Sequence, residues 1–392
     1  MKAVHFGAGS IGRGFIGELL HDSGYKTVLI DINESLINQI NRDHFYELYI
    51  IEKNYEQKII DKVTALSSIK YPKLVTKEIT EADIITTSVG LENLVRVASV
   101  ISTGLLERKK QKKEKINILA CENAMFNSEI LKKEILKLQQ LSENELNLVA
   151  AFPNTAVDRL VLESKKNGNN VINIGVEHEL VIEKNKMANP NHLPIKGAKY
   201  TDNLKKFIER KLYIVNCGHA WASYLGAIYG YEIMMEIFSD NYLVSKTKEA
   251  MMESAKVLTK KHDFSLEELQ TYIDFVIQRF KTPGIFDTVN RVCRSPIQKL
   301  GPAERLVGPA IQCENRRLKN ERLLEGIAAV FHFDNPDDQQ SRKLIKYVSD
   351  RGILNAVTHY TGLEKESRMV KQIIKYYESM LDVKGEKDER NV

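Results

Sequence analysis

Cysteine is scarce in this 392-residue sequence, and the few cysteines show no pairing pattern. The four cysteines occur singly, with no C-x-x-C pair, so the spacing gives neither a zinc site nor a disulfide framework. A chain without such a framework is typical of a reducing compartment. We therefore expect a cytoplasmic protein with no metal site.

Long apolar runs are also absent. No uninterrupted stretch approaches the ~20 apolar residues of a membrane helix, and the first six residues lead straight into a glycine loop, which leaves no room for a signal peptide. The sequence also has no large excess of positive or negative charge, because 57 Lys and Arg against 52 Asp and Glu leave a net charge of only +5. So mild a charge does not indicate nucleic-acid binding. We expect a small-molecule substrate, no membrane or nucleic-acid partner, and a monomer or small homo-oligomer.

The first half of the sequence alternates short strands with amphipathic helices. A first helix is expected over 11–21, and strands are expected over 3–6, 27–32, 83–89, 116–121, 146–152 and 171–176. Strands that alternate with helices predict βαβ units and a parallel sheet. Residues 45–64 are β-rich and predict hairpin-like material inserted in this domain.

From about residue 201 the pattern changes to long helical periods, such as 242–260 and 266–280. The turn-rich segment 188–194 separates the alternating strand–helix pattern from the helical pattern. We predict an α/β Rossmann-type N-terminal domain over 1–195 and a mostly α-helical substrate and catalytic domain over 196–392. The basic run 108–113 is expected to be a solvated helix end, with an anion-binding patch as the alternative.

A glycine loop directly after the first strand matches the pattern G-x-G-x-x-G. In a strand–loop–helix setting, the first glycine allows a tight turn and the second allows close approach to a pyrophosphate. The third lets the helix pack closely on the strand. A glycine turn without a ligand is the alternative. The loop consists of Gly7, Ala8, Gly9, Ser10, Ile11 and Gly12.

Two further residues are expected at the cofactor. Asp31 ends the second strand, where a carboxylate binds the ribose hydroxyls and repels a 2′-phosphate. NAD is therefore the expected cofactor in preference to NADP. Thr87 ends the strand over 83–89 and is expected to border the cofactor at the carboxyl ends of the strands.

A candidate for acid/base chemistry lies near the start of the helical half. On an α-helix, Asn216 and His219 share a face, and Lys211 lies within ~80° of His219 at 100° per residue. A lysine serves as a general acid/base where burial or a nearby cation lowers its pKa. The same spacing also fits incidental surface and core residues.

These motifs together resemble the polyol-specific long-chain dehydrogenase/reductase family, over nearly the whole chain. The resemblance implies a Rossmann-type domain, a helical domain, an active site between them, and NAD-dependent oxidation of sugar alcohols. The modest length and the early glycine loop are similar to the branch that acts on a phosphorylated hexitol. The resemblance to the family rests on the glycine loop and on the pattern K-x-x-x-x-N-x-x-H that begins at Lys211. It also rests on 120–123 (ACEN), 152–159 (FPNTAVDR), 209–211 (ERK) and 325–329 (EGIAA).

The resemblance also implies roles for individual residues. Lys211 would be the general acid/base, and His219 would bind and orient the polyol. Asn216, together with Asn154 of the FPN motif, would hydrogen-bond the reacting oxygen. The residues that it implies beside the nicotinamide are Glu122 and Asn123.

The chain departs from the family pattern at Cys217, Leu180 and Gln298, where Thr, Trp and Arg are usual. If that arginine contacts the phosphate, Gln298 favours an unphosphorylated polyol or a hexuronate as substrate. This alternative stays open, as does a non-catalytic NAD-sensing protein. Arginine and lysine suit a phosphate dianion, and the candidates for binding it are Arg294, Lys299 and Arg305.

Overall fold

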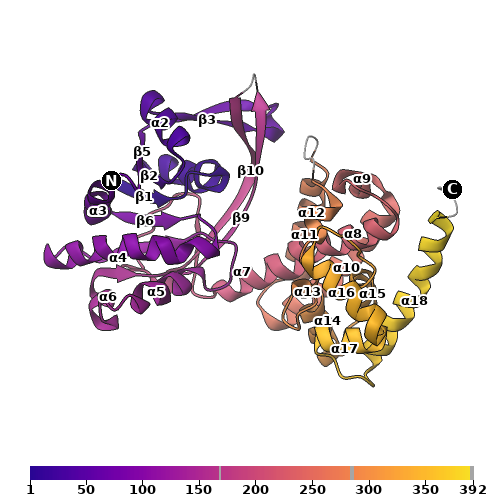
Figure 1. The fold of residues 1–392 in the computed structure, drawn as a ribbon. Helices are drawn as coiled ribbons and strands as arrows, with labels where there is room; N and C mark the ends of the chain where they lie inside the picture. The colour runs from indigo at the N-terminus through magenta and orange to yellow at the C-terminus, as the bar shows by residue number, and fades with distance from the viewer. Residues whose placement is uncertain (167–168, 283–286, 389–392) are drawn as a thin grey trace. The chain divides into compact units, whose positions relative to one another are not determined.

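The computed structural model describes residues 1–166, 169–282 and 287–388 and forms two compact units, Met1–Phe207 and Ile208–Val392 (Figure 1). The boundary falls inside helix α7 (Leu204–Arg210), beyond the turn-rich segment 188–194. Strand β11 (Lys199–Thr201) explains the later position, because it still pairs with a strand of the first unit. Each unit is described by itself below.

The first unit is built on a six-stranded parallel sheet of order β5-β2-β1-β6-β7-β8. This is the doubly wound order: the chain leaves β1 toward β2 and later returns to form β6 on the other side. A crevice therefore opens between β1 and β6 at their carboxyl ends. The strands are β1 (Lys2–Phe6), β2 (Lys26–Asp31), β5 (Val63–Ser67), β6 (Ile84–Thr87), β7 (Ile116–Ala120) and β8 (Ala150–Ala151).

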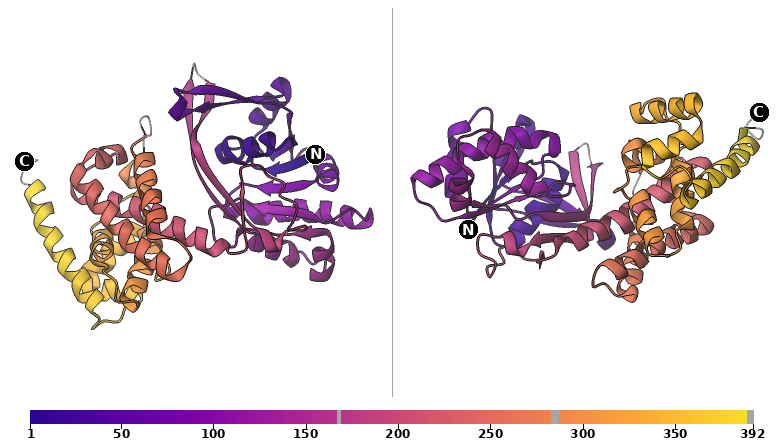
Figure 2. Two further views of the ribbon diagram at one scale, coloured as in Figure 1. Left: turned by 180° about the vertical axis from the view of Figure 1, so that it is seen from behind. Right: turned by 90° about the horizontal axis from the view of Figure 1, so that it is seen from below.

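Alternate side chains of these strands belong to different cores. Val4 and Phe6 pack with one layer of helices, whereas Ala3 packs on the opposite face. Burial on both faces explains why the strands read as nearly continuous apolar runs. The first layer is α3 (Pro72–Glu81), α4 (Leu94–Lys110), α5 (Asn127–Lys137) and α6 (Glu143–Val149), seen in Figure 2. The opposite face is covered by the π-helix η1 (Gly12–Gly17), α1 (Glu18–Asp22) and part of β10.

The β-rich segment 45–64 forms the hairpin that the sequence predicted. Strands β3 (Tyr46–Ile50) and β4 (Glu56–Ile60) are antiparallel and belong to a second, mixed sheet. In that sheet β10 (Asn169–Glu183) runs parallel to β3 and antiparallel to β9 (Thr155–Lys166). The strand expected over 171–176 is only part of the first half of β10. The helix α2 (Glu34–Asp43) packs between this sheet and β2.

The prediction of a strand over 146–152 is mostly wrong. Residues Glu143–Val149 form α6, and only Ala150–Ala151 pair with β7. Ser142 and Glu145 form a capping box, in which each side chain accepts a hydrogen bond from the other residue's backbone N–H. This S-x-x-E signal predicts a helix start and outweighs the short apolar run that follows.

The basic run 108–113 also differs from the expectation at its first residue. Arg108 is buried, and its guanidinium donates to the carbonyl oxygens of Thr80 (2.8 Å), Ala82 (2.9 Å) and Glu114 (2.7 Å). It thereby satisfies carbonyl groups at the end of α3, a role that a cation at a helix C-terminus commonly has. The arginine is part of the core, not of a solvated end.

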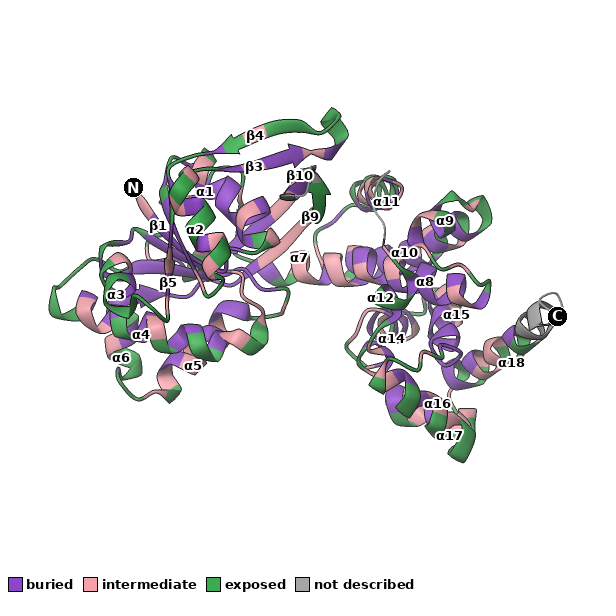
Figure 3. Ribbon diagram, turned by 45° about the horizontal axis from the view of Figure 1, so that its top comes forward, coloured by how far each residue is buried: buried purple, intermediate pink, exposed green. Residues whose placement is uncertain are grey.

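The second unit is helical, with one core arranged around α8 (Cys217–Ile228), which is buried along nearly its whole length (Figure 3). The helices expected over 242–260 and 266–280 are confirmed as α10 (Asn241–Lys261) and α11 (Leu266–Phe280). Its other helices are α9 (Met234–Ser239), α12 (Val289–Cys293), α13 (Pro296–Lys299), α14 (Val307–Asn315), α15 (Glu321–Val330), α16 (Gln339–Arg351), α17 (Ile353–Thr361) and α18 (Arg368–Asp388).

The EGIAA segment lies on α15 and has a packing role. A Cβ on Gly326 would overlap the Trp221 indole, so glycine lets α15 lie against α8. The indole N–H of Trp221 donates to the Arg322 carbonyl oxygen at 2.7 Å. Among the helices that the structure describes, none is both long enough and apolar enough to cross a membrane.

Candidate functional site

The glycine loop lies at the carboxyl end of β1, where the crevice opens. Gly7 adopts φ +99°, a left-handed conformation that favours glycine. A Cβ on Gly12 would overlap the Gly7 carbonyl oxygen, whereas a Cβ on Gly9 would meet no atom within 4 Å. The backbone at Gly9 therefore borders open space in which a ligand can approach. Arg13 closes the loop, since its Nε donates to the Ala8 carbonyl oxygen at 2.7 Å.

His5 lies beneath this loop and was missed by the sequence analysis. Its Nδ1 lies 2.7 Å from Thr86 Oγ1 and its Nε2 lies 2.9 Å from Ser88 Oγ. Burial lowers the pKa of His5 to about 4, so the ring is neutral at pH 7. The imidazole therefore links β1 to β6 and to Ser88, just after β6. The available signal was a histidine inside an otherwise apolar strand, two residues before the loop.

Asp31 links the end of β2 to the glycine loop. Its carboxylate accepts hydrogen bonds from the backbone N–H of Ala8 (2.6 Å), Ile32 (2.7 Å) and Asn33 (2.9 Å). A pocket of about 510 Å³ opens beside it. The walls are mostly apolar, with one carboxylate and with Arg96 among the polar lining residues. Such walls suit an adenosine, in which a flat base adjoins ribose hydroxyls. The lining includes Gly7, Gly9, Asp31, Ile32, Ile69, Arg96, Val97 and Val100.

The other predicted loop residues do not line this pocket. Ser10 and Ile11 follow Gly9 and precede η1, with Ser10 partly exposed and Ile11 exposed. Ala8 is fully buried and contributes only its backbone N–H to Asp31. The pocket is therefore offered backbone by the loop at Gly9 and side-chain charge by Asp31 at the end of β2.

On the opposite side of the crevice, Glu122 connects the end of β7 to the loop after β6. Its buried carboxylate accepts hydrogen bonds from Thr87 Oγ1 (2.9 Å), Val89 N (2.9 Å) and Gly90 N (2.8 Å). The structure thus brings the predicted residues Thr87 and Glu122 into direct contact. Asn123, the next residue after Glu122 in the segment that follows β7, is exposed.

Asn154 is buried immediately before β9. Its amide nitrogen donates to Glu129 Oε1 (3.1 Å) and Glu183 Oε2 (2.9 Å), and its Oδ1 accepts from the Glu129 backbone N–H (3.2 Å). Both amide hydrogens are therefore engaged by carboxylates of α5 and β10. Sequence reasoning did not identify these two acids, which lie far from Asn154 along the chain.

In the second unit the lysine and asparagine of the Lys/Asn/His motif lie on a π-helical turn, and the histidine lies on the α-helix that follows. The π-helix η5 spans Lys211–Asn216 and continues into α8. The sequence analysis assumed α-helical steps, but π-helical hydrogen bonds join residues five apart, so Lys211 and Asn216 lie one turn apart on one face. Lys211, Asn216 and His219 are all partly exposed, whereas Tyr213–Val215 are buried. Such turns are frequent at functional sites.

His219 lies between an aromatic ring and a carboxylate. Its ring stacks on Phe280 with centroids 4.7 Å apart, and its Nε2 lies 3.7 Å from Asp287 Oδ2. Burial lowers the pKa of His219 to about 4 against the opposing effect of Asp287, with Arg291 and Arg279 lowering it further. The neutral ring can both donate and accept a hydrogen bond. Asp287, which also pairs with Arg291, was missed by the sequence analysis.

Glu209 and Arg210, the first two residues of the ERK segment, anchor the chain just before Lys211. The guanidinium of Arg210 lies over the Tyr272 ring at 4.3 Å and over the Phe264 ring at 5.5 Å. The carboxylate of Glu209 binds Lys261 (2.8 Å) and His262 (2.7 Å). Arg210 is therefore held in the core of this unit, which restrains the backbone that enters the π-turn.

The three cations predicted to bind phosphate have different surroundings. Lys299 is buried, and its ammonium donates to the carbonyl oxygens of Val292 (2.6 Å) and Arg294. Burial, assisted by the charge of Arg305, lowers the pKa of Lys299 to about 8. Arg294 is exposed, and Arg305 pairs with Glu304 at 3.1 Å. Lys299 and Arg294 thus lie together, while Arg305 already has an acidic partner.

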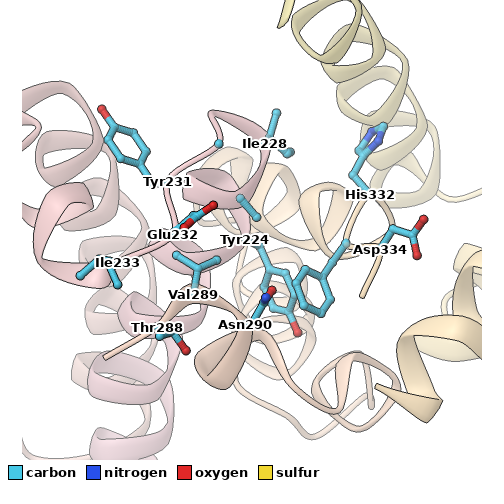
Figure 4. Close-up of a pocket in the computed structure, with 13 residues that line it drawn as sticks. Tyr224, Ile228, Tyr231, Glu232, Ile233, Thr288, Val289, Asn290, His332 and Asp334 are labelled. Carbon is cyan, nitrogen blue, oxygen red and sulfur yellow. The ribbon is translucent and has the colours of Figure 1, made fainter. Parts of the chain in front are cut away.

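A pocket of about 530 Å³ in the second unit contains none of the predicted site residues (Figure 4). Its walls include Tyr224 and Ile228 near the end of α8, Asn290 on α12, and Glu232. Within the described ranges, no group of three or more His, Cys, Asp or Glu side chains could hold a metal ion.

The parallel sheet in doubly wound order, with a glycine loop at its crevice, defines a Rossmann-type dinucleotide-binding protein. Residues 1–196 match the family described as the mannitol dehydrogenase Rossmann domain, and residues 203–381 match the mannitol dehydrogenase C-terminal domain. The chain therefore belongs to the mannitol dehydrogenase family of oxidoreductases.

Similar proteins cover nearly the full length. A relative from Oceanobacillus iheyensis, named mannitol-1-phosphate 5-dehydrogenase, is 39% identical over 95% of this chain and 97% of its own. A relative of the same name from Caldanaerobacter subterraneus subsp. tengcongensis is 38% identical over 96% and 98%.

Among solved structures, Pseudomonas fluorescens mannitol 2-dehydrogenase, in a ternary complex with NAD and D-mannitol, has a TM-score of 0.75 at 17% identity. That similarity covers 98% of this chain and 92% of that one. A substrate-free D-sorbitol dehydrogenase has a TM-score of 0.82 at 15% identity, covering 97% and 93%. These structures share the fold.

Proposed function

We propose that this protein is a cytoplasmic NAD-dependent dehydrogenase that interconverts D-mannitol 1-phosphate and D-fructose 6-phosphate by hydride transfer, with a lysine as general acid/base and without a metal. The observation that supports the reaction type best is that Lys211 and Asn216 on η5, and His219 on the first turn of α8, are all partly exposed. The choice of substrate rests on the full-length relatives named mannitol-1-phosphate 5-dehydrogenase.

The first unit fits a dinucleotide in one orientation. The pocket at Asp31 lies between the ends of β2 and β5 and the first turns of α4 and suits the adenosine, while the open space at Gly9 suits the pyrophosphate. The nicotinamide half then lies on the side of β6 and β7, near Thr87 and Glu122. Bound there, NAD supplies the hydride acceptor for alcohol oxidation, and NADH supplies the hydride for ketose reduction.

The second unit supplies the proton chemistry. Lys211 takes the proton of the reacting hydroxyl during oxidation and returns it to the carbonyl oxygen during reduction. Asn216, one turn away, donates an amide N–H to that oxygen as negative charge develops. His219 orients the polyol through a ring nitrogen, with Asp287 on its other side. For Asn154 to bind the same oxygen, one of its carboxylate partners has to release an amide hydrogen.

A phosphate requires further donors. An ammonium group has three N–H bonds, and Lys299 directs two of them to backbone carbonyls, which leaves one for a phosphate oxygen. Exposed Arg294 lies beside it and can bind in a forked geometry. Arg305 joins them only if Glu304 releases it. We propose that Lys299 and Arg294 are the principal phosphate ligands.

Cofactor choice is expected to depend on Asp31. The unmodified enzyme should use NADH with a kcat/KM about 10- to 100-fold above that for NADPH, because the carboxylate repels a 2′-phosphate. Asp31→Asn keeps one acceptor for the Ala8 N–H but removes the charge, so the ratio should fall. Asp83→Asn is the control, since Asp83 accepts from the Lys2 N–H at the amino ends of β1 and β6, away from the glycine loop. Equal use of NADPH and NADH by the unmodified enzyme would contradict the assignment.

The substrate is tested by following NADH oxidation with fructose 6-phosphate, fructose and a hexuronate. We expect fructose 6-phosphate to exceed fructose in kcat/KM by at least about 10²-fold, because each charge-assisted hydrogen bond contributes about 1.5–3 kcal/mol. Arg294→Gln and Lys299→Gln should raise KM for the phosphorylated sugar alone. Arg317→Gln, which changes an exposed arginine after α14, is the control.

The outcomes separate the candidate functions. Equal kcat/KM for fructose and fructose 6-phosphate would favour an unphosphorylated polyol. Turnover of the hexuronate alone would favour a hexuronate reductase. NADH binding without turnover of any of the three sugars would favour a non-catalytic NAD-sensing protein.

A further inference from the structure

The first turn of α5 carries a buried polar cluster that the sequence analysis did not identify. Asn127 and Ser128, the first two residues of this helix, are both fully buried. The Asn127 amide nitrogen lies 3.0 Å from the Glu122 carbonyl oxygen, 3.1 Å from the Thr155 carbonyl oxygen and 3.0 Å from Thr155 Oγ1. Its Oδ1 accepts from the backbone N–H of Thr155 (3.1 Å) and Ser128 (2.9 Å).

Neighbouring groups extend the cluster to the end of β7. Ser128 Oγ accepts from the Ala120 N–H at 2.9 Å, and Thr155 Oγ1 donates to the Ala120 carbonyl oxygen at 2.9 Å. The next helical residue, Glu129, binds the Asn154 amide. Three successive residues of α5 therefore hold two separate segments, 120–122 and 154–155, against one another.

We propose that Asn127 is a positioning residue for the nicotinamide half of the cofactor. This inference rests on the proposed binding of NAD in the crevice. The two segments that Asn127 joins carry Glu122 and Asn154, on the β7 side of the sheet. The carboxylate of Glu122 in turn holds Thr87 and the loop after β6. Asn127 makes its hydrogen bonds to backbone groups and to the Thr155 hydroxyl, so it acts through the segments it fixes.

Burial makes this arrangement sensitive to a change at Asn127. Removing one partner of a buried hydrogen bond leaves the other unsatisfied, which costs more than the bond contributes when intact. Asn127→Ala would leave the Thr155 N–H in this state, while the Glu122 carbonyl would keep only its hydrogen bond from the Ala124 N–H at 2.8 Å. Segments 120–122 and 154–155 would then relax, whereas the glycine loop and Asp31 have no contact with Asn127.

The test compares NADH with ADP-ribose, which lacks the nicotinamide. For Asn127→Ala we expect the Kd for NADH to rise about tenfold, as for the loss of roughly one hydrogen bond, and the Kd for ADP-ribose to change by less than about twofold. The ratio of the two constants distinguishes positioning from general destabilisation, which would weaken both ligands. Asn117→Ala is a matched control, since Asn117 is a buried asparagine nearer the other end of β7, where its Oδ1 accepts from the Ala188 N–H. It should leave the ratio unchanged.

The outcomes are separable from those of the proposed function, because neither affinity requires a sugar substrate. If Asn127→Ala fails to bind ADP-ribose, Asn127→Ser, which keeps a hydroxyl in the cluster, replaces it in the comparison. Normal NADH affinity in a folded variant would overturn the proposal, as would equal weakening of NADH and ADP-ribose. Failure of both variants to bind ADP-ribose would also overturn it, because Asn127 would then be required for folding itself.

Discussion

Replacing Lys211 with alanine is expected to lower kcat for fructose 6-phosphate reduction by about 10²–10⁴-fold, the range that a general acid/base contributes. The affinity for NADH should stay within about twofold, because cofactor binding is assigned to the glycine loop and Asp31 in the other unit. Steady-state turnover and titration of NADH fluorescence measure the two effects separately.

Two further variants make this result specific. Lys211→Arg keeps the positive charge, but a guanidinium does not release its proton near neutral pH, so turnover should be lost as in Lys211→Ala. Lys205→Ala removes an exposed lysine of α7 and should change neither quantity. Near-normal turnover of Lys211→Ala would require another base. Retention of activity by Lys211→Arg would indicate that the lysine contributes only charge.

The second large effect concerns the glycine loop, where one alanine substitution should impair NADH binding alone and another should impair both stability and NADH binding. Gly9→Ala is expected to leave the free energy of unfolding within about 0.5 kcal/mol of the unmodified protein, because the added Cβ meets no protein atom. The Kd for NADH should nevertheless rise at least about tenfold, since the methyl group enters the space assigned to the pyrophosphate.

Gly12→Ala should instead destabilise the first unit by about 1–3 kcal/mol and abolish NADH binding, because the Cβ would overlap the Gly7 carbonyl oxygen and lie 2.8 Å from His5 Nε2. Backbone atoms there have no rotamer by which to move aside. Urea unfolding and NADH titration test both variants. Normal NADH affinity in Gly9→Ala would contradict the assigned path of the pyrophosphate. Equal destabilisation by the two substitutions would contradict the separate roles given to the two glycines.

Much of the architecture could be predicted because its signals are local. The helices over 242–260 and 266–280 follow from a 3.6-residue period, and the hairpin within 45–64 follows from β-rich composition between turns. The glycine loop is equally local, since tight turning and close approach are properties of a few consecutive residues. Capping is also local: the S-x-x-E signal at Ser142, which was missed when the strand over 146–152 was predicted, indicates α6.

The candidate site depends partly on a local detail that spacing alone did not reveal. Lys211, Asn216 and His219 were identified by their pattern, but the π-turn that places Lys211 and Asn216 one turn apart was not. A single extra residue per turn changes which side chains share a face, and α-helical and π-helical hydrogen bonds differ too little in sequence preference to be distinguished beforehand.

The sequence by itself determined the fold class, the helical half, the dinucleotide loop and the family to which the chain belongs. Only the tertiary structure decided that Arg108 is buried against α3, that His5 ties β1 to β6, and that Asn127 joins Glu122 to Thr155. The physical reason is the same for all three. A polar side chain is buried when groups from distant parts of the chain satisfy its hydrogen bonds, and those partners are known only once the chain has folded.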